Sequence, residues 1–157
     1  MIGMGLILVV NLHGSINSSA PVRKSLNELW VAKKFSASVV PDDAATVGML
    51  RLCKDYVAWA PVDEGLLAEL LSKRGMVSTS RSLDQTALKG LGFNDHKALA
   101  AQMVKEQKRL AAVPGILPYF RLAPPKGGFK RSLRRQSTEK GTLGSNPKLD
   151  EIVRRMI

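Results

Sequence analysis

The sequence has very few of the residues that staple small secreted proteins or bind metal ions. It contains one cysteine, Cys53, and two histidines among 157 residues. A single cysteine cannot form a disulfide within the chain, which excludes a disulfide-stapled secreted scaffold. One cysteine and two histidines also cannot supply the four Cys and His ligands of a structural zinc site. We therefore expect no metal and no other cofactor.

Long hydrophobic runs and aromatic residues are also scarce. The longest apolar run, Leu6–Val10, is far shorter than the roughly 20 residues of a membrane-spanning helix, so no membrane partner is expected. Phe, Trp and Tyr make up 5% of the chain, and Trp30 and Trp59 are expected in the core. Because stacking on single-stranded RNA needs displayed aromatic rings, the composition favours contacts to the nucleic-acid backbone.

Acidic residues are outnumbered, 13 against 24 Lys and Arg, which gives a net charge of +11. The excess is concentrated after residue 120, where ten basic residues face three acidic ones. This imbalance indicates a polyanionic partner. Residues 121–140 carry a single acidic residue, Glu139, and like charges at this density resist packing, so we expect the segment to order on its partner. Its basic residues are Arg121, Lys126, Lys130, Arg131, Arg134, Arg135 and Lys140.

The pattern of apolar residues over 1–60 predicts alternating strands and helices. Strands are expected at 5–12, 37–40 and 56–60, with helices at 21–34 and 44–55 between them. Alternation of this kind usually indicates a parallel sheet, but helices this short also fit a ferredoxin-like α+β fold.

Residues 61–157 are expected to form a mostly helical extension. A helix capped by Asp63 is predicted to stop at Gly75, residues 76–83 are expected to form a loop, and a further helix should run from about 95 to 112. A strand at 119–122 then leads into the basic loop 121–140. A last helix is predicted to begin at Asn146 and Pro147, with an inner stripe of Leu149, Ile152, Val153 and Met156.

Catalytic signals are weak. There is no dinucleotide fingerprint, no phosphate loop and no nucleophile elbow. Cys53 is expected to be a buried small hydrophobe, and the paired carboxylates lie at helix starts, where capping explains them. The alternative that the chain is an enzyme, with Lys126 to Lys130 as an anion site, therefore lacks a visible catalytic base or metal ligand.

Three stretches of the sequence resemble one protein family. The stretch 119–129, with Pro-Pro-Lys-Gly-Gly at its centre, resembles the P-P-[RK]-G-G loop of the archaeal and eukaryotic branch of large-subunit ribosomal protein L-thirty. Residues 48–59 resemble that family's second helix and third strand, and 140–144 with 152–156 resemble its C-terminal end. The resemblance covers nearly the whole chain and is weakest over residues 76–93.

The resemblance implies a structural rRNA-binding protein without catalysis, located in the cytoplasm in the ribosome. The fold implied is a three-stranded antiparallel sheet with two helices on one face over residues 1–60, followed by a C-terminal extension over 61–157. The implied partners are large-subunit 23S-type rRNA, 5S rRNA and neighbouring large-subunit proteins, with no small-molecule substrate. Eukaryotic relatives carry a basic N-terminal extension, so a chain that starts at its first strand favours an archaeal source.

The candidate RNA-binding residues centre on the glycine-proline loop. Two glycines allow the main chain to approach phosphates, and two prolines reduce the ordering cost. Lys126 replaces the Arg of many relatives and cannot make its bidentate contact, and His13-Gly14 stands where many relatives have Arg-Gly. The candidates in the loop and its flanks are Arg121, Pro124, Pro125, Lys126, Gly127, Gly128, Lys130, Arg131, Arg134, Arg135 and Lys140. The candidates in the N-terminal unit, residues 1–60, are His13, Arg23, Lys24, Arg51 and Lys54.

Two other functions would also account for the excess positive charge. An architectural nucleic-acid-binding protein outside the ribosome would need the same basic segment but not the specific loop. A small enzyme acting on a phosphate substrate would need the catalytic groups that the sequence lacks.

Overall fold

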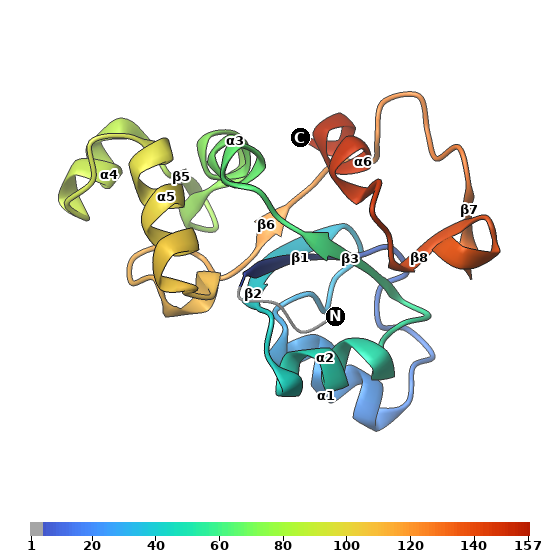
Figure 1. Ribbon diagram of the computed structural model, residues 1–157. Coiled ribbons are helices and arrows are strands. Elements are labelled where there is room, and N and C mark those ends of the chain that lie inside the picture. The colour runs from blue at the N-terminus through green and yellow to red at the C-terminus, as the bar shows by residue number, and fades with distance from the viewer. Residues whose placement is uncertain (1–4) are drawn as a thin grey trace.

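The centre of the fold is a three-stranded antiparallel sheet. The computed structural model describes residues 5–157, so the first four residues of the predicted core lie outside the described part. Strand β1 (Leu6–Asn11) lies between β2 (Ser36–Pro41) and β3 (Val57–Pro61) and is antiparallel to both. Helices α1 (Ala20–Glu28) and α2 (Ala44–Leu52) join these strands and cover one face of the sheet (Figure 1). The predicted α+β, ferredoxin-like core is therefore confirmed.

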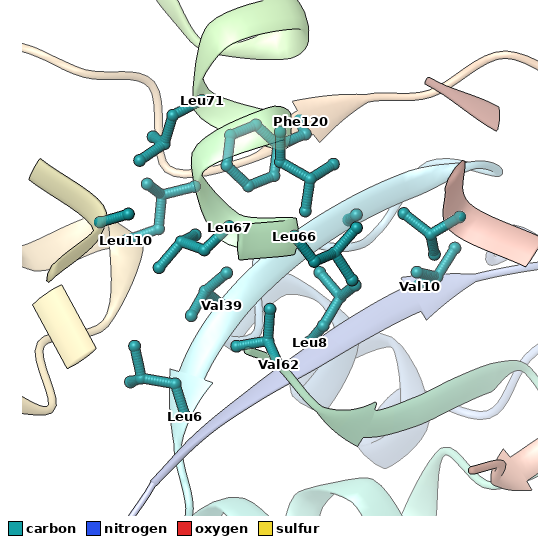
Figure 2. Close-up of a cluster of buried hydrophobic side chains, with 14 of the residues drawn as sticks. Leu6, Leu8, Val10, Val39, Val62, Leu66, Leu67, Leu71, Leu110 and Phe120 are labelled. Carbon is teal, nitrogen blue, oxygen red and sulfur yellow. The ribbon is translucent and has the colours of Figure 1, made fainter. Parts of the chain in front are cut away.

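Strand β1 is buried on both faces, which explains its uninterrupted apolar sequence. Ile7 and Val9 pack in a cluster with residues of α1 and α2, such as Leu26 and Leu50. The even-numbered residues of β1 belong to a second cluster, because successive side chains of a strand point to opposite faces. That cluster includes Leu6, Leu8 and Val10 from β1, Val39, Val62, Leu66, Leu67 and Leu71, and Leu110 and Phe120 from the C-terminal half (Figure 2).

The C-terminal half adds strands to both edges of the central sheet. Strand β6 (Phe120–Arg121) pairs antiparallel with β2, and β8 (Gly141–Ser145) pairs parallel with β3. Strand β7 (Ser132–Gln136) in turn pairs parallel with β8, which gives the order β6-β2-β1-β3-β8-β7. The sequence predicts neither β7 nor β8.

Helices of the C-terminal half cover the second face. In Figure 1, α3 (Glu64–Arg74) and α6 (Leu149–Met156) lie on the side of the sheet opposite α1 and α2. The remaining elements are β4 (Met76–Ser78), β5 (Arg81–Ser82), α4 (Gln85–Gly90), α5 (His96–Glu106) and two short 3-10 helices, η1 (Leu110–Ala112) and η2 (Ser137–Glu139). Within residues 5–157, none of the helices has the length and apolar character to cross a membrane.

Carboxylates cap the helices where the sequence indicates. The side chains of Asp43, Asp63 and Asp95 each accept a hydrogen bond from the backbone N–H three residues later, at 2.7 to 2.9 Å. Each bond satisfies one of the N–H groups that a helix start leaves without a partner. The bond from Thr46 also lowers the pKa of the Asp43 carboxyl below its ordinary value. Capping therefore accounts for these acidic residues.

The first helix is shorter than predicted. It ends at Glu28 instead of continuing to Lys34, because the backbone turns left-handed at Trp30 (φ 61°) and again at Phe35 (φ 62°). The same turn moves the Trp30 side chain out of the core, where the sequence places it, and leaves it 46% exposed. Helical spacing of apolar residues thus continues past the real end of the helix.

Three other element boundaries also differ from the prediction. Residues 76–83 contain the short antiparallel pair β4–β5 instead of a loop only. Helix α5 ends at Glu106 and not near residue 112, because Gln107 is left-handed (φ 52°). Helix α6 begins at Leu149, and Asn146 precedes it, with its side-chain oxygen accepting from the Lys148 N–H at 3.0 Å.

Candidate nucleic-acid interface

The sheet topology brings the candidate residues to one end of the molecule. Asn11, the last residue of β1, pairs with Val57, the first of β3. Ser36, the first residue of β2, pairs with Arg121 at the end of β6. The turn after β1, the turn before β3 and the exit of β6 therefore all lie at this end of the sheet.

Buried Asn11 shapes the turn that carries His13. Its side-chain oxygen accepts from the His13 N–H at 2.9 Å, and its amide nitrogen donates to the Val31 carbonyl at 2.6 Å. The exposed His13 ring then meets the Leu133 carbonyl through Nε2 and the Tyr56 ring edge-on at 6.4 Å. The first turn of the chain is thus joined to the basic segment, residues 121–140, across 120 positions of sequence.

The first half of the basic segment is fastened to the last helix. The Arg155 carbonyl accepts from the Lys126 N–H at 3.1 Å, and the Arg155 guanidinium donates to the carbonyls of Lys126 and Gly128 at 3.2 and 3.0 Å. The Phe129 ring stacks on the Phe35 ring with 6.2 Å between centroids. Figure 1 shows this stretch passing α6 on its way from β6 to β7.

The second half of the basic segment forms β7 and lies against the α2–β3 turn. The Gln136 amide donates to the Lys54 carbonyl at 2.9 Å and to the Asp55 carboxylate at 3.2 Å. Neighbouring β8 approaches closely because Gly141 has no side chain: a Cβ there would overlap the Arg135 carbonyl oxygen. These contacts explain why a strand forms where the charge pattern indicates only a loop.

The glycine-proline loop forms a tight turn. Gly127 (φ 81°) and Gly128 (φ 73°) both adopt left-handed conformations that L side chains rarely accept, and the Gly128 N–H donates to the Pro125 carbonyl at 3.0 Å. Pro124 and Lys126 are exposed on this turn. Pro125 is buried and shapes the turn from inside, and its contact with RNA stays a prediction.

The candidates on α1 and α2 lie on neighbouring helix ends. The Cys53 thiol, just after α2, is 3.8 Å from the Val22 carbonyl in α1. This contact brings the first turns of α1, with Arg23 and Lys24, next to the end of α2. The Arg23 guanidinium donates to the Ser18 carbonyl at 2.9 Å, which fixes its position at the start of α1.

The basic side chains predicted from the sequence are exposed. Within the described residues, the ion pair found joins Lys108 and Glu106 at 2.7 Å, and none involves a candidate residue. Carboxylates of the protein therefore leave the positive potential of this end largely uncompensated. We call these exposed side chains the basic surface: His13, Arg23, Lys24, Arg51, Lys54, Arg121, Lys126, Lys130, Arg131, Arg134, Arg135 and Lys140.

A basic hollow beside α6 was missed by sequence reasoning. It has a volume of about 320 Å³, and its lining includes Lys130, Arg131, Lys148 and Arg155 with one carboxylate, Glu151. The sequence explains Arg155 only as a cation at a helix C-terminus. No local pattern shows that it faces Lys130 and Arg131, since the fold alone brings these residues together.

The structure gives little support to catalysis. Cys53 is buried, as predicted, and burial raises the pKa of its thiol to about 11, so the reactive thiolate is rare at neutral pH. In residues 5–157, His, Cys, Asp and Glu side chains do not gather in threes that could hold a metal ion.

The chain is similar over almost its entire length to archaeal ribosomal proteins. It is 37% identical over 153 residues to large ribosomal subunit protein uL30 of Cenarchaeum symbiosum, covering 98% of this chain and 99% of that protein. It is 35% identical over 156 residues to the uL30 protein of Thermofilum pendens, covering 98% and 100%. The chain belongs to the uL30 family. The uL30 protein of Nanoarchaeum equitans is 33% identical over 156 residues, again with 98% and 100% covered.

Membership of the uL30 family confirms the resemblance identified from the glycine-proline loop and its flanking segments. The relatives are named as proteins of the large ribosomal subunit, and they come from archaea. No family model matches the chain, so the assignment depends on these whole-length relatives.

Proposed function

We propose that this uL30 protein is a structural constituent of the large ribosomal subunit and binds rRNA through the basic surface. The observation that carries the proposal is the placement of the basic segment. Its seven basic side chains are exposed, and its backbone is tied to α6 through Arg155, to the first turn through His13 and to the α2–β3 turn through Gln136. A positively charged surface on a fixed backbone suits the phosphates of folded RNA.

The glycine turn supplies close contacts within this surface. Gly127 and Gly128 are exposed, so an RNA strand can approach the main chain there more closely than at any residue with a side chain. Lys126 contributes a point charge beside them, and the hollow lined by Lys130, Arg131 and Arg155 can receive a phosphate. His13, Lys54 and Arg51 extend the contact along the same end of the sheet.

The partners proposed are 23S-type and 5S rRNA and neighbouring proteins of the large subunit, with the protein located in the ribosome in the cytoplasm. We further propose that residues 1–60 act as the folding core and 61–157 as an extension that displays the RNA-binding segment. A catalytic role is not part of the proposal, because the candidate nucleophile is buried and the candidate carboxylates cap helices.

The test measures association with purified large subunits and with large-subunit rRNA at several salt concentrations. We expect the protein to co-sediment with large subunits at moderate salt. If the basic segment makes about five phosphate contacts, log affinity should fall against log salt with a slope of roughly −4. Equal affinity for unrelated duplex DNA without co-sedimentation would favour the architectural alternative, and a slope near −1 would contradict binding through this segment.

A further inference from the structure

Trp30 is exposed in a conformation that a bulky residue rarely adopts. Its neighbours Leu29 and Val31 are fully buried, whereas Trp30 is 46% exposed at a backbone φ of 61°. A left-handed conformation is unfavourable for large side chains, and such positions concentrate at functional sites. The fold needs a left-handed residue here to end α1, but it does not need a tryptophan.

The Trp30 ring borders a groove with a second aromatic residue. The groove has a volume of about 410 Å³ and is lined by Asn27, Trp30, Ala32, Lys33, Ser36 and Tyr119. Tyr119 directly precedes β6, in which Phe120 is fully buried against the core. Strand alternation therefore directs Tyr119 and Arg121 away from that core, and the Arg121 guanidinium lies 5.9 Å from the centre of the Tyr119 ring.

Trp30 also lines a second hollow. It is lined by Ala20, Arg23, Lys24, Asn27, Glu28 and Trp30, with a volume of about 560 Å³. Trp30 thus lines two hollows that both contain cations: Lys33 in the first, and Arg23 and Lys24, beside Glu28, in the second. The first hollow, which we call the Trp30–Tyr119 groove, has no carboxylate in its lining.

We propose that the Trp30–Tyr119 groove binds an unpaired RNA base, which stacks on the indole while Lys33 and Arg121 contact the phosphates on either side. Aromatic rings interleaved with cations are the usual means of holding single-stranded RNA. Lys33 in the lining and Arg121 beside the Tyr119 ring, with no carboxylate in the lining, favour an anionic nucleotide over an apolar protein segment. The proposal rests on the proposed rRNA binding and adds a base contact, which the low aromatic content of the sequence argued against.

The test uses Trp30→Asn, because Asn tolerates the left-handed conformation and preserves the end of α1. The probes are an eight-nucleotide adenylate strand and an eight-base-pair RNA duplex. We expect the strand to quench the fluorescence of the natural protein, and Trp30→Phe to abolish most of that signal. Affinity of Trp30→Asn for the strand should fall about tenfold, with an unchanged salt slope and unchanged affinity for the duplex. Ile16→Asn, which removes another exposed apolar side chain outside the groove, should behave as the natural protein.

The outcomes separate this proposal from rRNA binding in general. If Trp30→Asn binds the strand as tightly as the natural protein does, and salt-dependent rRNA binding is intact, the groove proposal alone is overturned. Natural affinity for all RNAs combined with poor entry into large subunits would also overturn it, in favour of a protein occupant. Failure of the natural protein to bind strand, duplex and large-subunit rRNA would overturn the proposed function itself.

Discussion

The Arg155 guanidinium holds the carbonyl oxygen of Gly128 at 3.0 Å, and so a cation of the last helix fixes the glycine turn of the basic segment. The same group also donates to the Lys126 carbonyl. Both bonds come from Nη1, whose two N–H groups lie in the plane of the guanidinium, so one nitrogen satisfies both carbonyls. Arg155, a basic residue beside the proposed RNA-binding surface, therefore acts on the shape of the loop.

Replacement of Arg155 by lysine should separate shape from charge. Lysine keeps the positive charge, but its ammonium lies on a shorter side chain and lacks the fixed planar N–H directions of Nη1. We therefore expect the two hydrogen bonds to weaken, the turn to loosen and rRNA affinity to fall severalfold. Stability should fall by about 1 kcal/mol, as for the loss of a typical hydrogen bond. Arg154→Lys, at an exposed neighbouring position, is the matched control. Natural rRNA affinity of Arg155→Lys would mean that the residue acts only as a charge.

Serine at Lys130, Arg131, Arg134 and Arg135 should weaken RNA binding without unfolding the protein. All four side chains are exposed, and surface substitutions usually change stability by less than about 0.5 kcal/mol each. Relief of repulsion between like charges can even raise the melting temperature slightly. We expect rRNA affinity to fall on the order of a hundredfold and the salt slope to become shallower by about 3.

The control for this variant removes the same charge elsewhere. Serine at Lys73, Lys89, Lys97 and Lys105 changes four exposed lysines on α3, α4 and α5, far in the fold from β7. It should change the affinity much less. A collapsed melting temperature with normal entry into large subunits, seen in the first variant, would show that the basic segment is structural.

Alanine at Gly141 should disrupt the edge of the sheet, whereas alanine at Gly128 should not. A Cβ at Gly141 would overlap the Arg135 carbonyl, so β7 and β8 must separate. A Cβ at Gly128 meets open space and costs only its left-handed conformation, φ 73°. We expect a loss of about 2 kcal/mol or more for Gly141→Ala and about 1 kcal/mol for Gly128→Ala in denaturant unfolding. Equal losses would contradict the close approach of the two strands.

Stability should decrease in alkaline solution through Cys53. Burial raises the pKa of its thiol from 9.0 to about 11, so above pH 9 the unfolded chain loses a proton that the native protein keeps. The contribution of the protonated thiol to the free energy of unfolding is complete below pH 9. About 1 to 2 kcal/mol of it is lost as the pH rises towards 11. Lys and Tyr titrate in the same range, so the measurement is the difference between the natural protein and Cys53→Ala at pH 8 and pH 10.5. A difference independent of pH would contradict the raised pKa.

The core was predictable because its signals are local. The apolar run of β1, the aspartates before α2 and α3, and the prolines that end β2 and β3 each act within a few residues. The glycine-proline loop was also visible in the sequence, together with the charge around it. These features led to the correct family and to one cluster of basic residues.

The rest depends on contacts between distant parts of the chain. Strand β7 forms because Gln136 bonds to the α2–β3 turn and because Gly141 of β8 leaves room for the Arg135 carbonyl. No pattern within residues 121–140 predicts these contacts. Trp30 continues the helical spacing of the apolar residues in α1, so periodicity places it in the core. Only the left-handed backbone conformation of Trp30 itself moves its side chain out of the core, and a tryptophan in the sequence does not predict that conformation.

The parallel pairing of β8 with β3 also has a consequence for how the protein acquires its shape. Ala58 pairs with Gly144, whereas the strands β1, β2 and β3 pair over much shorter distances in sequence. Contacts between distant residues form late, since a long loop must close first. The three central strands can therefore assemble while synthesis continues, but the edge that carries Arg134 and Arg135 is completed only when the far end of the chain arrives. The edge proposed to bind RNA is thus completed after the three central strands, together with the part of the core that Leu149, Val153 and Met156 supply.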